Sequence, residues 1–218
     1  MSNNPITIFE QGSEIWHFYG YQFTGINSAN GEATFKDVNG DGSITSADRT
    51  NLGSAIPKYN YGITLTASYK GFDALVFGSG SQGNKIYQSL VRTDRLTGNR
   101  LYDEFYDNRW SSTNTTGTKP GASTDISKYL ISNAMVKDGS FFKIKQIQLG
   151  YTIPTSLLKN IQISNLRLYV SLDDFFTFTN YKGFDPEACS AGTGSSQGVD
   201  KGTYPVSKKF VAGINITF

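Results

Sequence analysis

The chain has 218 residues, a net charge of +2 and only 17% charged residues, against the ~25% typical of globular domains. Its 15 Phe, 13 Tyr and 23 Gly form a composition of strands and turns, which excludes a coiled coil or a helical bundle. The small net charge argues against a nucleic-acid partner, and the single cysteine excludes an internal disulfide framework and a cysteine-based zinc site.

The first part of the chain predicts short strands. Residues 15–26 favour a strand, and residues 33–36 favour a shorter one. No run approaches the length of about 18 apolar residues that a transmembrane helix needs, and residues 1–5 lack the charged and apolar regions of a signal peptide. The lack of a long apolar run does not exclude membrane-spanning strands, because their alternating pattern gives only a weak hydropathy signal.

Residues 37–48 carry the most specific local motif. Acidic or amide side chains stand at positions 1, 3, 5 and 12 and a glycine at position 6, as in calcium loops of the EF-hand and dockerin type. The candidate ligands are Asp37, Asn39, Asp41, the carbonyl of Ser43, and Asp48. The flanks do not predict an EF-hand helix pair, so a bound Ca²⁺ or similar hard cation would hold a loop together. The alternative is a turn without an ion, because Asp and Asn favour turns by themselves.

The clearest periodic segment is 61–69, in which apolar and polar residues alternate. Such alternation predicts a strand with one apolar and one polar side. Residues 70–73 then predict a tight turn, and residues 74–82 predict the returning strand of a hairpin. The glycines of 78–83 match G-x-G-x-x-G, but they follow a hairpin strand rather than a buried parallel strand, so we expect no organic cofactor.

Two long connections, 84–128 and 179–206, are rich in Gly, Ser, Thr and Asn and contain scattered aromatic residues. Loops longer than about 12–15 residues are uncommon in compact domains and are usually functional or disordered. Tyr102, Tyr106 and Trp110 are the candidates for stacking on cargo. The alternatives for these rings are packing within the loop and contact with a partner protein.

The C-terminal half predicts further strands. A short one is expected near 129–137, and longer ones are expected over 141–151, 165–178 and 210–218. Within 141–151 the apolar positions shift by one residue, which predicts a β-bulge near Lys145 and Gln146. Residues 154–160 predict one short helical turn.

No group of residues predicts catalysis. The carboxylate pairs Asp103–Glu104 and Asp173–Asp174 are sequence neighbours, and neighbours on a strand point to opposite faces, so neither pair can flank one glycosidic bond. His17 is the only histidine, which leaves nucleophilic catalysis without an evident base. We therefore expect no enzyme activity.

A series of short motifs, taken together and in order, resembles the C-terminal part of SusC/RagA-type TonB-linked outer-membrane transporters. They occur at residues 35–42, 48–49, 52–53, 57–62, 69–73, 138–143, 149–154, 166–169 and 183–187. The chain also ends in Phe218 after apolar residues at alternate positions, which is similar to the signal read by the outer-membrane barrel-assembly machinery. The residues of this assembly signal are Phe210, Ile214, Ile216 and Phe218.

The resemblance implies an all-β fold, an antiparallel transmembrane β-barrel segment with long extracellular loops, from a plugged barrel of about 22 strands. Residues 1–218 would form the C-terminal part of this barrel, with the acidic loop 37–48 inside it. About six to eight strands are expected, and the plug domain and signal peptide are missing, so the chain is expected to be an incomplete piece.

The resemblance also implies a place in the outer membrane of a Gram-negative, Bacteroidetes-type cell. The implied partners are a SusD-like surface lipoprotein, TonB acting through the missing N-terminal part, the barrel-assembly machinery, and oligosaccharide or peptide cargo. The implied function is nutrient import, to which the chain contributes barrel strands and extracellular loops without transporting anything alone.

A soluble, calcium-stapled all-β module for carbohydrate binding or adhesion is the alternative. The two hypotheses differ in the surroundings of the apolar faces. These faces contact lipid in a barrel, whereas they contact each other in a sandwich.

Overall fold

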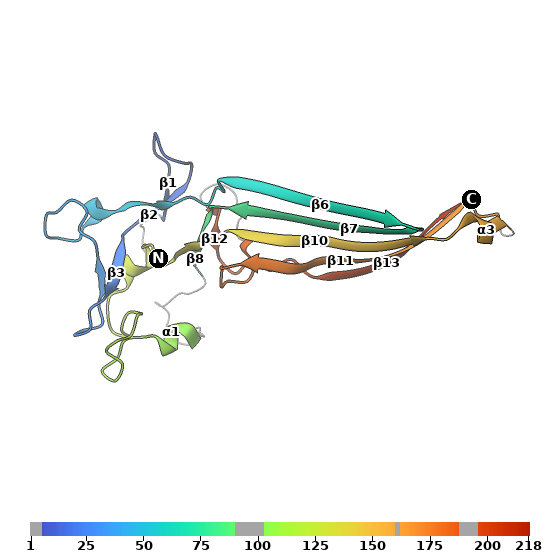
Figure 1. The fold of residues 1–218 in the computed structure, drawn as a ribbon. Coiled ribbons are helices and arrows are strands. Elements are labelled where there is room, and N and C mark those ends of the chain that lie inside the picture. The colour runs from blue at the N-terminus through green and yellow to red at the C-terminus, as the bar shows by residue number, and fades with distance from the viewer. Residues whose placement is uncertain (1–5, 90–102, 160–161, 188–195) are drawn as a thin grey trace.

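The computed structural model describes residues 6–89, 103–159, 162–187 and 196–218. One long antiparallel sheet extends from a head of short strands, turns and small helices, as Figure 1 shows. The strands of the sheet are ordered β13-β11-β10-β7-β6. Their bounds are Tyr59–Tyr69 (β6), Phe72–Gln82 (β7), Phe141–Thr152 (β10), Asn165–Thr179 (β11) and Lys209–Thr217 (β13). The antiparallel all-β class is therefore confirmed, with five long strands in this sheet.

At the end of the sheet that is far from the head, a tight turn joins β6 to β7, and residues 153–164 join β10 to β11. The tight turn predicted over residues 70–73 is present but shorter: Lys70 and Gly71 alone, with φ of 47° and 89°, link β6 to β7, and Tyr69 lies opposite Phe72. Two successive residues with positive φ match the right-handed twist of a hairpin. The predicted helical turn is present as α3 (Thr155–Leu158), which lies in the connection between β10 and β11. Both connections at this end are shorter than the connections from β7 to β10 and from β11 to β13.

The predicted β-bulge in β10 is present. The pairing of β10 with both neighbours shifts between Ile144 and Gln146, and Lys145 is the extra residue against β7. On the other side, Asp174 and Phe175 of β11 lie opposite Lys145, and the φ of Asp174 is 58°. The bulge restores the alternation, so that Ile147 continues on the same face as Ile144.

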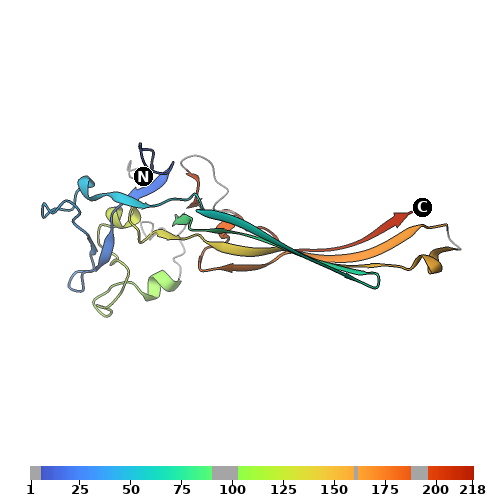
Figure 2. The same cartoon turned by 45° about the horizontal axis from the view of Figure 1, so that its top comes forward.

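One face of the sheet is apolar across all five strands. In one row of paired residues, Leu65, Val76, Ile147, Leu172 and Phe210 lie side by side, and directly paired residues share a face. Leu65 is 64% exposed and Phe210 is 67% exposed. In Figure 2 the sheet is a single twisted layer over most of its length, and no other described element covers either face there. These side chains are not sealed in a sandwich core, which argues against the alternative module.

The opposite face of the sheet is mostly polar. Its side chains include Thr64, Thr66 and Ser68 of β6, Ser79 and Ser81 of β7, Gln146 and Gln148 of β10, Ser171 and Asp173 of β11, and Asn215 and Thr217 of β13. An apolar face backed by a polar face is the pattern of an outer-membrane barrel wall whose interior is wet.

Two glycines of β7 make room for aromatic rings from the neighbouring strands. The rings of Tyr61 and Phe142 are stacked with centroids 5.9 Å apart, although β7 runs between their strands. A Cβ on Gly80 would lie 2.8 Å from Tyr61, and one on Gly78 would lie 2.4 Å from Phe142. The glycine-rich end of β7 therefore serves the packing of aromatic rings, in agreement with its position in a hairpin strand.

The head contains three small sheets, ordered β1-β2-β5, β12-β8-β9 and β3-β4. Their strands are β1 (Thr7–Ile8), β2 (His17–Gly20), β3 (Phe23–Ile26), β4 (Ala33–Phe35), β5 (Thr50–Gly53), β8 (Lys85–Gln88), β9 (Val136–Asp138) and β12 (Val199–Asp200). The helical segments are η1 (Ser46–Asp48), α1 (Asp103–Asp107) and α2 (Ser127–Leu130). Among the described residues, no helix is both long and apolar enough to cross a membrane.

Two predicted strands of the head are wrong in detail. The strand expected over 15–26 is divided into β2 and β3, because Tyr21 instead forms an isolated bridge with Ser132. The segment expected as a strand over 129–137 contains only the end of α2 and the start of β9. Tyr129 is buried with Phe105 and Met135, so tertiary packing overrides the local strand preference.

Candidate functional site

Five charged side chains gather where the polar face of the sheet meets the head. The ammonium group of Lys143, on β10, lies 2.8 Å from a carboxylate oxygen of Asp185 and 2.9 Å from one of Glu187. Lys145, the bulge residue, lies 2.6 Å from Glu187 and 3.2 Å from Asp174. We call these residues, Lys143, Lys145, Asp174, Asp185 and Glu187, the ion-pair cluster. It joins two strands of the sheet to the loop that follows β11.

Asp185 holds the two ends of that loop together. Its carboxylate accepts hydrogen bonds from the backbone N–H groups of Glu187 and Val206, each at 3.0 Å. Asp185 and Lys143 are both buried, and Lys143 is only 2% exposed. Burial by itself would raise the pKa of Asp185, but the bonds from Lys143 and Val206 outweigh burial and lower this pKa. The carboxylate is therefore held in its charged form.

The pKa of Glu187 is set by the same two opposing effects, burial and hydrogen bonding. Burial favours its neutral form, whereas hydrogen bonds from Lys145 and Lys143 favour its charged form, and the net effect lowers its pKa. Glu187 also lines a pocket of about 360 Å³ at the head end of the polar face, together with Asn60, Ser79, Ser81 and Phe141. The cluster thus fixes one wall of an open pocket that is lined by both polar and apolar groups.

A second ion pair lies on the polar face, at the far end of the sheet. Arg167 of β11 donates from Nε to Asp73 of β7 at 2.9 Å, across the intervening strand β10. Gly150 of β10 lies between them, and a Cβ there would lie 2.5 Å from the guanidinium group. This pair ties three strands of the sheet and does not involve the head.

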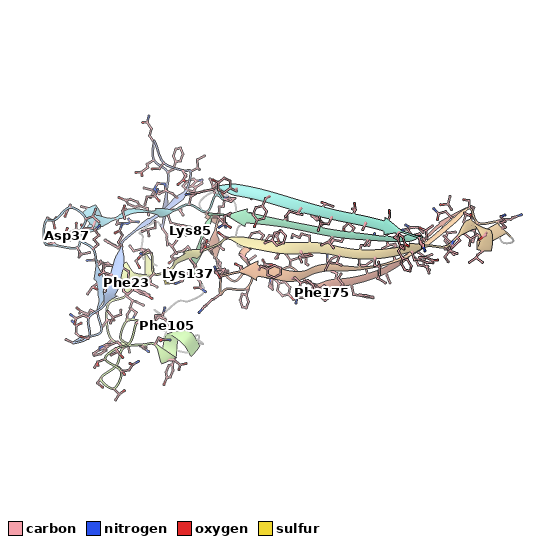
Figure 3. All side chains as sticks on the ribbon, viewed as in Figure 1. Phe23, Asp37, Lys85, Phe105, Lys137 and Phe175 are labelled. Atoms are coloured by element: carbon pink, nitrogen blue, oxygen red, sulfur yellow. The ribbon has the colours of Figure 1, made fainter. Side chains whose placement is uncertain are left out.

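The five predicted metal ligands lie in a loop of the head, and Figure 3 shows Asp37 at the outer end of that region. Asp37 accepts backbone N–H bonds from Gly40 and Gly42, and Asp41 accepts one from Ser43. Asp48 is buried and accepts bonds from three backbone N–H groups, those of Val38, Asn39 and Thr45. Bonds from Thr45 and Val38 lower the pKa of Asp48.

These bonds show how the loop is held by its own side chains. In the described parts of the chain, no three His, Cys, Asp or Glu side chains are grouped closely enough to hold a metal ion. The candidate ligand set contains three carboxylates, on Asp37, Asp41 and Asp48, and an amide, on Asn39, which is the chemistry that Ca²⁺ prefers. Calcium binding stays a prediction.

The three candidate aromatic residues differ in their surroundings. Tyr102 lies outside the described residues. Tyr106, on α1, is 69% exposed and free to contact a ligand or a partner. Trp110 donates from Nε1 to the carbonyl of Ser28 at 2.9 Å, and its ring fills the space above Gly31. Trp110 therefore packs the head, which is one of the alternatives that the sequence leaves open.

The predicted assembly signal forms the last strand, β13. Phe210, Ile214 and Ile216 point to the apolar face of the sheet and are exposed, as is the terminal Phe218. Their alternation along the strand is the one expected from the sequence. Recognition by an assembly machinery stays a prediction.

The ion-pair cluster is the feature that analysis of the sequence missed. The segments 138–143 and 183–187 contribute to the family resemblance, but nothing in either segment indicates that Lys143 and Asp185 are partners. The useful signal is a pair of lysines, Lys143 and Lys145, at the start of a strand whose other residues are uncharged. A buried lysine needs a carboxylate partner, and a nearby Asp-Pro-Glu segment supplies two.

No protein-family model matches the chain. Among curated proteins, TonB-dependent receptor P3 of Formosa agariphila is 32% identical, over 97% of this chain and 23% of the relative. TonB-dependent receptor SusC of Bacteroides thetaiotaomicron is 28% identical, over 100% of this chain and 21% of the relative. The chain thus spans about a quarter or less of the length of these relatives. Their names describe receptors, not enzymes.

Solved structures give the same result. The RagAB peptide transporter matches with a TM-score of 0.83 and 25% identity, over 100% of this chain and 24% of that chain. The RagAB peptide importer in its closed-closed state matches with a TM-score of 0.81 and 26% identity, again over 100% of this chain and 24% of that one. The chain therefore corresponds, in sequence and in fold, to the C-terminal barrel portion of the SusC/RagA-type TonB-dependent receptors.

Proposed function

We propose that the chain supplies barrel strands and extracellular loops to an outer-membrane TonB-dependent importer of nutrients. The observation that carries this proposal is the division of the sheet into an exposed apolar face and a polar face across all five strands. In a barrel wall the apolar side contacts lipid, and the polar side lines an aqueous interior. The similarity to SusC and RagAB supports the same function.

The described sheet has two edge strands, β6 and β13. Each presents unpaired backbone groups along one side, and hydrocarbon cannot satisfy them. Five strands are also too few to enclose the lumen of a barrel of about 22 strands. We therefore propose that residues 1–218 do not transport cargo alone and need further strands to close a barrel.

The proposed cargo is an oligosaccharide or a peptide. The solved RagAB structures are named as a peptide transporter or importer, which supports peptide cargo. The exposed ring of Tyr106, and the hydroxyl and amide groups that line part of the pocket beside Glu187, suit either class, because both present polar edges and stackable faces. We do not propose Trp110 as a residue that stacks on cargo, because its ring packs within the head.

The proposed partners follow from the same relationship. A SusD-like surface lipoprotein would cover the head, and TonB would act through a part of the transporter outside this chain. The barrel-assembly machinery would read β13, and the cell compartment would be the outer membrane of a Bacteroidetes-type bacterium. Replacing Phe218 with alanine should lower the amount of folded protein in the outer membrane, whereas Asn215→Ala on the polar face should not. Equal folded amounts for both variants would rule out Phe218 as an assembly signal.

Uptake assays test the transport proposal. Cells that produce a full-length receptor containing these residues should import labelled oligosaccharide or labelled peptide in a TonB-dependent manner, and cells that produce residues 1–218 alone should import neither. Active import by the 218-residue chain would contradict the proposal. A chain that is monomeric in water without detergent would favour the alternative binding module.

A further inference from the structure

The loop between β11 and β13 is attached to the sheet at its base. Asp185, close to the start of the loop, accepts N–H bonds from Glu187 and from Val206, which lies close to the loop's end. The same carboxylate pairs with Lys143 of β10. One buried carboxylate therefore closes the base of the loop and fixes that base to the polar face of the sheet.

A second set of contacts ties the same loop to the head. Strand β12 pairs in parallel with β8, so that Val199 lies opposite Tyr87. The carboxylate of Asp200 is buried and accepts hydrogen bonds from the hydroxyl of Tyr181 and from the backbone N–H of Gly202. Figure 1 shows β12 at the junction of the head and the long sheet. The loop thus bridges two parts of the molecule.

We propose that Lys143 is a positioning residue that sets the place of this loop at the mouth of the barrel, and that import depends on its pairing with Asp185. The proposal rests on the proposed transport function and names a residue that governs it. Lys143 contacts no cargo in this account. It acts through Asp185 and Glu187; Asp185 fixes the base of the loop, and Glu187 forms one wall of the adjacent pocket.

The chemistry of the pair favours a positioning role over a purely stabilising one. Removing two charges from water is costly, and a buried ion pair often contributes little more to stability than apolar residues of similar size. What the pair does provide is a fixed position, because Oδ2 of Asp185 accepts from both the Lys143 ammonium group and the Val206 N–H, while Oδ1 accepts from the Glu187 N–H. In the described residues, Lys143 is the only cation paired with Asp185.

Hydrogen–deuterium exchange tests the attachment directly, in the full-length protein inserted in membranes. The probes are the backbone amides of Glu187 and Val206, which donate to Asp185. In Lys143→Met the carboxylate loses its ammonium partner, and exchange at Val206 should rise at least about tenfold, because local opening becomes easier. Lys143→Arg keeps the charge and should retain protection.

Arg167→Met is the matched control, because it removes an ion pair from the same face of the sheet without touching the loop. This variant should leave exchange at Val206 unchanged. If Lys143→Met does not fold, Asp185→Asn carries the same test, since an amide has one acceptor oxygen for two N–H donors and forms no ion pair. Unchanged exchange at Val206 in the folded variants would overturn the proposal.

Uptake of labelled cargo distinguishes a failure of the Lys143 proposal from a failure of the transport proposal. Lys143→Met should reduce the rate of import, and Lys143→Arg should restore it. Faster exchange at Val206 with undiminished import would overturn the dependence of import on the pair. If the parent imports no cargo but Val206 still responds to Lys143→Met, the transport proposal fails and the attachment of the loop stands.

Discussion

At the residue scale, Gly31 determines where the ring of Trp110 lies in the head. Its φ is 74°, and a Cβ there would lie 2.4 Å from the ring of Trp110. The ring is fixed from its other end by the hydrogen bond to Ser28. A sequence can flag a tryptophan in a long loop as a stacking candidate, but it does not reveal that a glycine about 80 residues earlier has left space for the ring.

Gly31→Ala should destabilise the head more than Gly12→Ala does. Both glycines have positive φ, of 74° and 87°, so each variant carries a backbone penalty of about 1–2 kcal/mol. A Cβ on Gly12 meets no atom within 4 Å, whereas one on Gly31 meets the Trp110 ring and adds about 1–3 kcal/mol from overpacking. Urea unfolding followed by tryptophan fluorescence measures the difference. Equal losses would show that the ring moves aside freely.

The attachment of the loop should weaken in acid. The folded protein lowers the pKa of both Asp185 and Glu187, so their contribution to stability is fully present above their ordinary values, near about 4, and is lost as the pH falls through the lowered values. Exchange at Val206, corrected for the intrinsic pH dependence of exchange, should therefore be constant between about pH 5 and 7 and rise below about pH 4. A corrected rate that falls in acid would contradict the assigned charge states.

At the element scale, the sequence predicts the long strands well and the head poorly. The alternation in 61–69 and the one-residue phase shift near Lys145 are local signals, and both β6 and the bulge of β10 are present. The head is different, because its short elements are selected by packing between distant segments. α2 replaces a predicted strand where Tyr129 packs edge-to-face on Phe23, which is more than 100 residues away in the sequence.

The acidic loop, residues 37–48, is predicted to bind Ca²⁺. Each of its carboxylates accepts backbone N–H bonds and keeps further lone pairs, so we expect added Ca²⁺ to raise the melting temperature of the parent protein. Asp41→Ala should abolish the rise. Asp125→Ala, which removes a carboxylate near α2, should retain it. Differential scanning calorimetry with and without Ca²⁺ measures these shifts, and an unresponsive parent would leave a turn held by hydrogen bonds alone.

In the candidate site, too, residues that are close in sequence can be predicted together, whereas partners that are distant in sequence cannot. The acidic loop is contiguous, so its five candidate ligands can be named from spacing alone. Lys143 and Asp185 are 42 residues apart, and neither strand alternation nor turn chemistry relates them. Their pairing results from the return of the chain after β11, which only the three-dimensional structure reveals.

At the scale of the whole molecule, a single-layer sheet with an exposed apolar face is not a stable object in water. Contiguous apolar surface of this kind marks contact with lipid or with another protein. Leu65, Leu149, Val170 and Ile214 are exposed on four different strands of the same face. The ion pairs and hydroxyl groups lie on the opposite face, which fits a wall between lipid and water.

Spin labels on adjacent residues of β6 test whether the apolar face of the sheet contacts lipid while the polar face contacts water. In a Cys189→Ser background, a label at Leu65→Cys and a label at Thr66→Cys should report opposite faces of the same strand in the membrane-inserted protein. The account predicts that relaxation of the Leu65 label is enhanced mainly by oxygen, which concentrates in lipid, and that relaxation of the Thr66 label is enhanced mainly by a water-soluble nickel complex. The same preference at both positions, or a reversed one, would contradict it.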